Sequence, residues 1–232
     1  MSTLNIDDSD AFVHEGASFS VSRRHQSLSL QPCLGLLSPS VTFRPSGSSA
    51  LAEVYTIAEV YTIAVGESFG GGMVIYNRGI DYTGQVKGGY SEAIFHIEEG
   101  GSLSNVIDEP NQIESNEGDT TDVNGGGAYG AEDKIIQHNG GGTVSISDFP
   151  VEDFGKLYRS CGNCDNMYER HVILDGITAS TGSSPVGINC NYGDTVTISN
   201  VIVSNISDIC VEYEGNNTGD EPEKISSGYS DY

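Results

Sequence analysis

Positively charged residues are scarce in this chain of 232 residues. Ten Lys and Arg stand against 33 Asp and Glu, which gives a formal net charge of −23 and a pI near 4.2. A surface this acidic repels other polyanions, so the composition argues against nucleic acid or an anionic membrane as a partner.

Long apolar runs are also missing. No window approaches the roughly 18 apolar residues that a membrane helix needs, so no membrane-spanning helix is expected. There is no clear signal peptide either, because acidic residues at positions 7, 8 and 10 replace the usual basic and apolar regions. Two glycosylation sequons, at Asn205 and Asn216, are nevertheless compatible with secretion.

Cysteine is limited to five residues, an odd number that leaves one thiol over in a monomer. Cys161 and Cys164 form a CxxC motif, which in a cytosolic βαβ context would suggest a redox pair. No second CxxC or His pair lies nearby, as a zinc site would require. The spacing therefore favours a short structural disulfide, or two disulfides, in a secreted protein.

The second half of the chain contains regular strand alternation. Val144 and Ile146 alternate with polar residues; Val172 follows Val144 by 28 residues, and Val196 follows Val172 by 24. Strands that recur about every 25 residues, with Gly, Asn and Asp between them, are typical of stacked solenoid coils. A β-sandwich would show strands every 8–12 residues. The sequence therefore predicts an all-β fold, a parallel β-helix.

The remaining segments set the expected domain limits. We expect a poorly ordered extension over residues 1–51, the β-helix over 52–228 and a short tail over 229–232. The hexapeptide EVYTIA occurs twice in succession, at 53–58 and 59–64, and we expect only one copy to lie in the sheet. Residues 108–127 are polar and are predicted to be poor in strands.

Three of the ten cations fall within one short stretch. Lys134 and Lys156 are 22 residues apart, about one coil, and Arg159 follows three residues later. Neighbouring coils can therefore place them on one face. Like charges held together disfavour one another's protonation, so a lysine in such a cluster can serve as a base. The alternative is that these are ordinary solubilising side chains at unrelated turns.

Two neighbours of Lys134 are weaker candidates. Gln137 and His138 lie in the same short segment of sequence as Lys134. His138 has no Ser or Cys partner that would suggest a catalytic triad, so we interpret it as a structural residue. Asp133 can offer a carboxylate to a hard cation such as calcium, although a calcium site takes six or more oxygens.

The string DKIIQHNGGGTVSISDF, followed by VEDFGKLYRSCGNC and GINCNYGDTVTIS, resembles the fungal and oomycete pectate lyases of polysaccharide lyase family 3. SFGGGMVIYNRG, EAIFHIEEGGSLSNVI, NQIE and EYEGNNTGDEPEKISSG extend this resemblance over about residues 60–228. It implies a right-handed parallel β-helix that cleaves polygalacturonate or pectin by calcium-dependent β-elimination. It also implies an extracellular, monomeric enzyme.

The resemblance assigns roles to the cation cluster. Lys134, Lys156 and Arg159 match the family's basic catalytic cluster. Lys134 is expected to abstract the proton, while Lys156 and Arg159 bind and neutralise substrate carboxylates. Asp133 matches an acidic residue beside the calcium ion.

The chain departs from the family after Glu114. The family continues from NQIE with GVHC and a coil that carries an Asp and a Glu-Asp pair for calcium, and roughly thirty residues of this kind are absent here. Loss of a whole coil is tolerated by a solenoid because its neighbours can restack. The carboxylates after the junction are candidates for a replacement cation site: Glu114, Glu117, Asp119 and Asp122. Missing cysteine positions imply that Cys190 or Cys210 is unpaired.

Three hypotheses about function follow from this departure. The chain is an active or formerly active pectate lyase; or it is a catalytically impaired β-helix that binds pectin or a plant partner after losing its calcium ligands. The third hypothesis is a truncated gene model of an ordinary lyase, with a false amino terminus and a skipped exon. Turnover of polygalacturonate separates the first from the second, and transcript sequencing across the junction tests the third.

Overall fold

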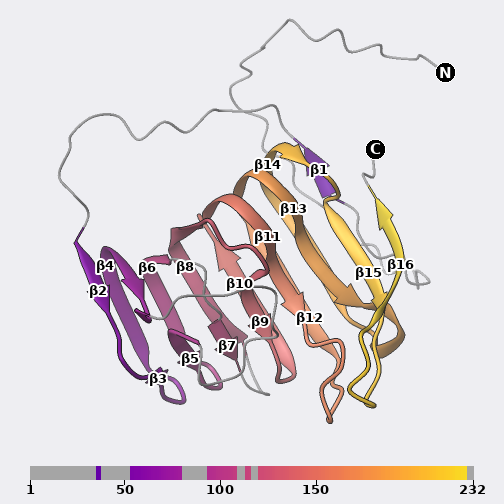
Figure 1. Cartoon of the computed structure of the whole chain (residues 1–232), viewed down its shortest axis with the longest axis horizontal. Coiled ribbons are helices and arrows are strands. Elements are labelled where there is room, and N and C mark those ends of the chain that lie inside the picture. Colours follow the sequence, from indigo (N-terminus) through magenta and orange to yellow (C-terminus); the bar gives the residue numbers. More distant parts are fainter. Residues whose placement is uncertain (1–34, 38–52, 80–92, 109–112, 116–119, 229–232) are drawn as a thin grey trace, which may run out of the picture.

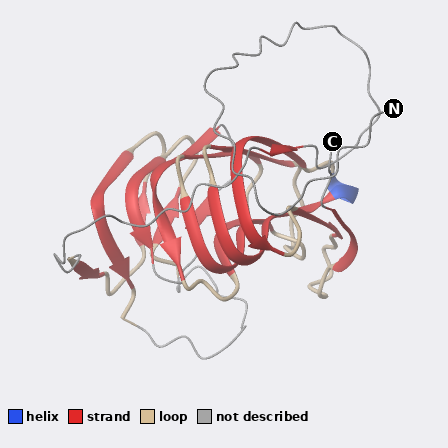
Figure 2. Cartoon of the chain, turned by 90° about the horizontal axis from the view of Figure 1, so that it is seen from above, coloured by secondary structure: helices blue, strands red, loops and turns tan. Residues whose placement is uncertain are grey.

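The computed structural model describes residues 35–37, 53–79, 93–108, 113–115 and 120–228. Nearly all of its regular elements are β-strands, and they stack along one axis from β2 to β16 (Figure 1). The strands follow one another as a coil of about six turns, seen from above in Figure 2. The predicted right-handed parallel β-helix is thus confirmed.

Parallel pairing divides the coil into three ladders. The first ladder contains the first halves of β4 (Ser68–Asn77), β6 (Ser102–Asp108), β8 (Thr120–Tyr129) and β14 (Thr195–Ile206), together with β10 (Gly142–Ser147) and β12 (Arg170–Asp175). The second contains β2 (Val54–Thr56), the second halves of β4, β6, β8 and β14, and the first halves of β11 (Pro150–Ser160) and β13 (Thr178–Asn189).

The third ladder contains β3 (Tyr61–Ile63), β5 (Phe95–Ile97), β7 (Ile113–Ser115), β9 (Lys134–His138), the second halves of β11 and β13, and β15 (Cys210–Glu214). A 3₁₀ turn, Cys190–Tyr192, follows β13. The strand β16 (Glu223–Gly228) pairs antiparallel with β15 and ends the described structure. Residues 223–228 therefore add an antiparallel strand to the last coil.

The corner between the first two ladders is built from residues with left-handed backbone angles. Asn105, Gly125, Asp148, Gly176 and Asn200 occupy it in successive coils, with φ between 51° and 69°. Asn, Asp and Gly are the residues that adopt this conformation at least cost. The polar residues between the apolar strings thus turn the chain at the same place in each coil.

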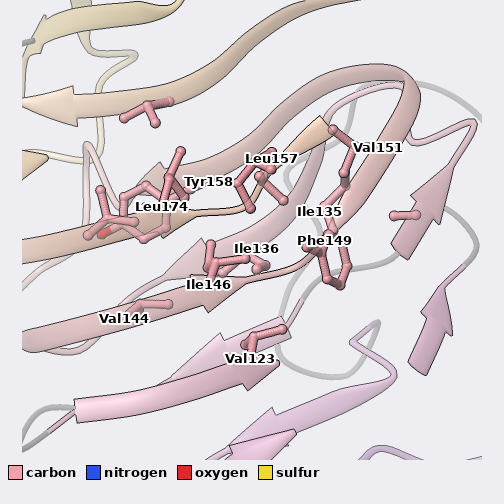
Figure 3. Packing of buried hydrophobic residues seen from close by; sticks show 14 of the residues in the cluster. Val123, Ile135, Ile136, Val144, Ile146, Phe149, Val151, Leu157, Tyr158 and Leu174 are labelled. Carbon is pink, nitrogen blue, oxygen red and sulfur yellow. The ribbon is translucent and has the colours of Figure 1, made fainter. Parts of the chain in front are cut away.

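The core consists of side chains that stack from coil to coil. Val123, Ile146, Leu174 and Ile198 are register partners on the first ladder, and the first three are buried. Figure 3 shows this packing, with Ile136 and Tyr158 of the third ladder facing the same interior. The predicted recurrence of Val144, Val172 and Val196 in three consecutive coils is confirmed.

Two local predictions were wrong. Both copies of EVYTIA contribute a strand, because β2 pairs with β4 and β3 pairs with β5, on different ladders. Residues 120–129 form the ten-residue strand β8, although 108–127 was predicted to be poor in strands. Its inward positions Thr121 and Val123 are buried, so two side chains with β-branching are enough to hold a polar segment in the ladder.

The junction after Glu114 is closed by ordinary strand pairing. β7 pairs directly with β9, with Ile113 opposite Ile136 and Ser115 opposite His138. The coil that precedes the junction therefore rests on the coil of Lys134, which is the restacking expected for a solenoid.

The N-terminal segment 1–51 is described only at β1 (Gly35–Leu37), which pairs parallel with β14. The rest of that segment and the tail 229–232 lie outside the described residues, so the domain limits stay a prediction. Among the cysteines, the Cys161–Cys164 disulfide is confirmed, Cys210 is also disulfide-bonded, and Cys190 is a free thiol.

Candidate active site

A pocket of about 300 Å³ opens on the third ladder and is lined by residues of β9, β11 and β15. Figure 1 shows these strands in the order β9, β11, β13 and β15 along the ladder. Its wall combines cations, acids and amides. The lining residues are Asp133, Lys134, Gln137, Lys156, Arg159, Ser160, Gly162, Asn163, Tyr213, Glu221 and Pro222. All three cations predicted to form a cluster are therefore in one pocket.

The two lysines are aligned by the coil repeat. Lys156 on β11 is the register partner of Lys134 on β9, as their 22-residue spacing predicts. Lys134 also forms an ion pair with its neighbour Asp133, and only 14% of the Lys134 side chain is exposed. A parallel ladder places side chains of paired residues on the same face, so both ammonium groups serve the same pocket.

Arg159 is the most constrained of the three cations. It is 6% exposed, and its Nη1 donates to the Ser160 carbonyl at 2.7 Å and to Asn189 Oδ1 at 2.9 Å. Its guanidinium lies 3.9 Å from the ring centre of Tyr213, a cation–π contact. Burial lowers the pKa of Arg159 to about 10, so the side chain remains charged near neutral pH.

A buried polar network fixes Arg159 from behind. Asn189 is fully buried; its Nδ2 donates to the Cys161 carbonyl at 2.9 Å, and its backbone N–H donates to Asp194 Oδ2 at 2.8 Å. The other Asp194 oxygen accepts from the Arg170 backbone N–H at 3.1 Å. Burial raises the pKa of Asp194. The network joins Arg159 to the disulfide-bonded turn and to the last coils.

Two glycines leave room for this arrangement. A Cβ atom at Gly187, the register partner of Arg159, would lie 2.8 Å from Arg159 Cδ and 3.3 Å from Lys156 Cδ. A Cβ atom at Gly162 would lie 2.6 Å from Arg159 Nη2. Any side chain at either position would push the cations away from their present places.

His138 lies in the protein interior rather than in the pocket lining. It is 1% exposed, with Nδ1 at 2.8 Å from the Tyr158 hydroxyl and Nε2 at 3.2 Å from the Gly141 carbonyl. Burial lowers the pKa of His138 to about 3, with the nearby Arg170 charge acting in the same direction. The ring is therefore neutral near pH 7, in agreement with the structural role predicted for it.

The described residues do not fit a complete calcium site. No group of three acidic, His or Cys side chains among them converges to hold a metal ion, and Asp133 is engaged by Lys134. Calcium takes six to eight oxygen ligands. Of the carboxylates considered for a replacement site, Glu117 and Asp119 lie outside the described residues.

Two residues of this site had no role in the sequence-based prediction. Tyr213 comes from the string EYEGNNTG, and Asn189 precedes the cysteine of GINC, so both lie in strings that resemble the family. Neither type is charged, and both lie far from the cluster in sequence. Their contacts with Arg159 arise only when β13 stacks on β11 and β15 stacks on β13.

Comparison with known proteins points to one family. The sequence profile of the pectate lyase family matches residues 46–115 and 111–220, two segments that meet at the junction after Glu114. "Pectate lyase H" of Emericella nidulans is 50% identical over 213 residues, covering 80% of this chain and 79% of its own. "Probable pectate lyase D" of Aspergillus fumigatus is 44% identical over 211 residues, covering 80% of this chain and 85% of its own.

Solved structures agree on the fold. Pectate lyase PelI from Erwinia chrysanthemi aligns with a TM-score of 0.53 and 21% identity, over 70% of this chain and 64% of its own. Pel3 from Pectobacterium carotovorum aligns with a TM-score of 0.53 and 18% identity, over 81% of this chain and 69% of its own. At these identities the likeness supports the β-helix alone. The family profile and the fungal relatives go further, and by both criteria this chain belongs to the pectate lyase family.

Proposed function

We propose that this protein cleaves polygalacturonate by β-elimination in the pocket between β9, β11 and β15. The observation that carries the proposal is the register of Lys134 on Lys156, with Arg159 in the same pocket. An acidic chain that concentrates three cations in one hollow has a site suited to a polyanionic sugar. A PelI structure from Erwinia chrysanthemi was solved in complex with tetragalacturonic acid.

The chemistry requires a base and a means of stabilising negative charge. Lys134 Nζ, in its neutral form, takes the proton from C5 of a galacturonate. The electron pair of the C5–H bond forms the C4–C5 double bond. The glycosidic oxygen leaves C4 with the electrons of the broken C4–O bond and takes a proton from water. Lys156 and Arg159 bind the carboxylate at C6 and stabilise the charge that develops beside C5. Arg159 is suited to this role because its buried guanidinium is already oriented by Asn189 and Tyr213.

Calcium dependence is a separate expectation. Members of the pectate lyase family typically use calcium, and a chain of charge −23 is repelled by pectate unless a divalent cation bridges the two. We expect a chelator to abolish pectate binding and added calcium to restore it. Binding that persists in the chelator would mean that the cation cluster suffices, and that Asp133 is not a calcium ligand.

We also propose that the protein acts outside the cell as a monomer. Disulfides persist in oxidising compartments, and here Cys161–Cys164 and Cys210 are oxidised. No helix in the described part of the chain is long and apolar enough to cross a membrane.

A second candidate function is pectate binding without turnover. It is favoured by the ion pair that engages the proposed base Lys134 with Asp133, and by the incomplete set of oxygen ligands among the described residues. Such a protein would still present Lys156 and Arg159 to a carboxylate.

One assay separates the two candidates. The protein is incubated with polygalacturonate and calcium, and the ultraviolet absorbance of the unsaturated product is followed. We expect turnover, and a loss of about 10²–10⁴-fold in kcat for Lys134→Ala. Lys224→Ala is the matched control, since Lys224 lies on β16 and pairs with Asp208 at 3.1 Å; its kcat should stay within about twofold. A wild-type protein that binds pectate without product would favour the second candidate.

A further inference from the structure

The pocket contains a buried hydrogen-bond acceptor with no partner. Gln137 lies on β9, is 4% exposed and lines the pocket. Its Nε2 donates to Asn139 Oδ1 at 3.1 Å. Its Oε1 is buried and accepts no hydrogen bond from the described residues. The amide is therefore anchored at its nitrogen, and its oxygen has no partner among the described residues.

An unused buried acceptor carries a free-energy cost. Leaving such a group unpaired costs about 1–3 kcal/mol, and the great majority of buried polar side-chain atoms in proteins have a partner. Rotation of the amide would not remove the cost, because the nitrogen would then lose Asn139 Oδ1. The position of Gln137 in the lining indicates that the missing partner comes with the ligand.

The neighbours of Gln137 define what that partner can be. Its register partner on β11 is Arg159, and Lys134 precedes it by three residues on the same strand. Lysine and arginine are donors only, so they recognise the carboxylate of a uronic acid and cannot recognise its hydroxyl hydrogens. An amide oxygen beside them can accept one. The secondary hydroxyls at C2 and C3 are the donors that a galacturonate unit carries.

We propose that Gln137 is a specificity-determining residue whose Oε1 accepts a hydrogen bond from a secondary hydroxyl of the galacturonate bound by Lys156 and Arg159. The protein then selects units with free hydroxyls, because an O-acetyl group removes the donor and leaves Oε1 buried and unpaired. Sites that hydrogen-bond a hydroxyl reject analogues without it more strongly than apolar pockets do. This inference rests on the proposed function of the same pocket.

The test uses Gln137→Met, which keeps the length of the side chain and removes the acceptor. The kcat/KM of wild type and variant is measured on polygalacturonate and on O-acetylated polygalacturonate. We expect wild type to prefer the free polymer by at least about tenfold, and the variant to lose about tenfold on the free polymer only. Asn217→Met, which replaces an exposed amide outside the pocket, should keep the wild-type preference.

Two further readouts separate this contact from a structural effect. The unfolding free energy of Gln137→Met should stay within about 1 kcal/mol of wild type, because the lost bond to Asn139 is offset by removal of an unpaired acceptor. Calorimetric titration of saturated tetragalacturonate into Lys134→Ala should show about tenfold weaker binding when Gln137→Met is added.

The outcomes are distinguishable. If wild type neither cleaves nor binds pectate, both the proposed function and this inference are overturned. If wild type cleaves pectate and Gln137→Met keeps the same preference for the free polymer, the inference alone is overturned. A large fall in the stability of the variant with an unchanged preference would assign Gln137 a structural role instead.

Discussion

The first and the last coils of the β-helix are held together by different side chains. Around β3, β4 and β5, the rings of Tyr61, Phe69, Tyr76 and Phe95 pack at centroid distances of 5.0–6.1 Å. Around β11, β13 and β15, buried polar groups take over, with Arg170 fully buried and donating to the carbonyls of Gly140 and Asn139 at 2.6 and 2.7 Å.

The two regions therefore have different roles: the aromatic coils stabilise the fold, and the polar coils position the charged side chains of the pocket. Burial of the aromatic rings stabilises the first coils mainly through the apolar area removed from water, a contribution that is non-directional. Hydrogen bonds to charged groups are directional and costly to leave unmade. The pocket lies in the polar region, so its most buried cation, Arg159, is held by the same hydrogen-bond network that stabilises these coils. The aromatic coils around β3, β4 and β5 do not line the pocket, so we expect them to affect it only through the stability of the whole β-helix.

The largest effect is expected from Phe95→Ala in the aromatic coils. Phe95 is fully buried, and its loss leaves a cavity among Tyr61, Phe69 and Tyr76. We expect the unfolding free energy to fall by about 3–5 kcal/mol, as for other buried Phe→Ala changes, while kcat of the folded protein is unchanged. Denaturant unfolding and the product assay measure the two quantities.

Tyr55→Ala is the control for that change, since Tyr55 is 53% exposed and lies 5.9 Å from the Tyr76 ring. Its effect on stability should stay below about 1 kcal/mol. A clear fall in kcat for Phe95→Ala would contradict this division of roles, because it would show that the first coils help to position the cations of the pocket.

The next effect concerns the polar coils and pH. The folded pKa of His138 is about 3, whereas the imidazole of the unfolded chain keeps its ordinary value near 6.5. Between these values the unfolded state binds a proton that the folded state does not. His138 therefore makes stability fall as pH drops from about 6.5 towards 3, by roughly 1 kcal/mol per pH unit. The stability above pH 6.5 is unaffected by this group.

Urea unfolding at pH 7.0 and 4.5 measures this slope in wild type and in His138→Gln. We expect the variant to lose less stability on acidification than wild type. His171→Gln is the control, since His171 is partly exposed on β12 and bonds Thr195 at 2.7 Å. An identical slope in His138→Gln and wild type would show that other titratable groups dominate the loss of stability in acid.

The smallest effect is expected from Gly187→Ala. The new Cβ atom would lie 2.8 Å from Arg159 Cδ, a distance that Cβ atoms essentially never show, so the arginine must shift. We expect kcat/KM to fall by about tenfold with little change in stability, because small misplacements of a charged group are costly in catalysis. Gly70→Ala is the control, as its Cβ would meet Ser104 Oγ at an ordinary 3.6 Å. Equal activity of both variants would show that Arg159 tolerates displacement.

Much of the fold could be predicted from the sequence because a solenoid repeats the same arrangement of strands and turns in each coil. The spacing of Val144, Val172 and Val196 fixed the coil length, and coil length in turn aligned Lys134 with Lys156. The pattern failed where strands are short or polar, at the EVYTIA repeat and at β8, because pairing with a neighbouring coil stabilises a strand that has little apolar alternation.

By itself, the sequence determined the ladder of coils and the presence of three cations on one face, since both follow from a regular spacing along the chain. Only the tertiary structure decided how those cations are held. Tyr213 and Asn189 reach Arg159 from strands 30 or more residues away, and Gln137 becomes an unpaired acceptor only after burial in the pocket wall. Contacts between coils form only when the coils stack. A local sequence pattern therefore does not predict which uncharged side chain will lie beside a charged one.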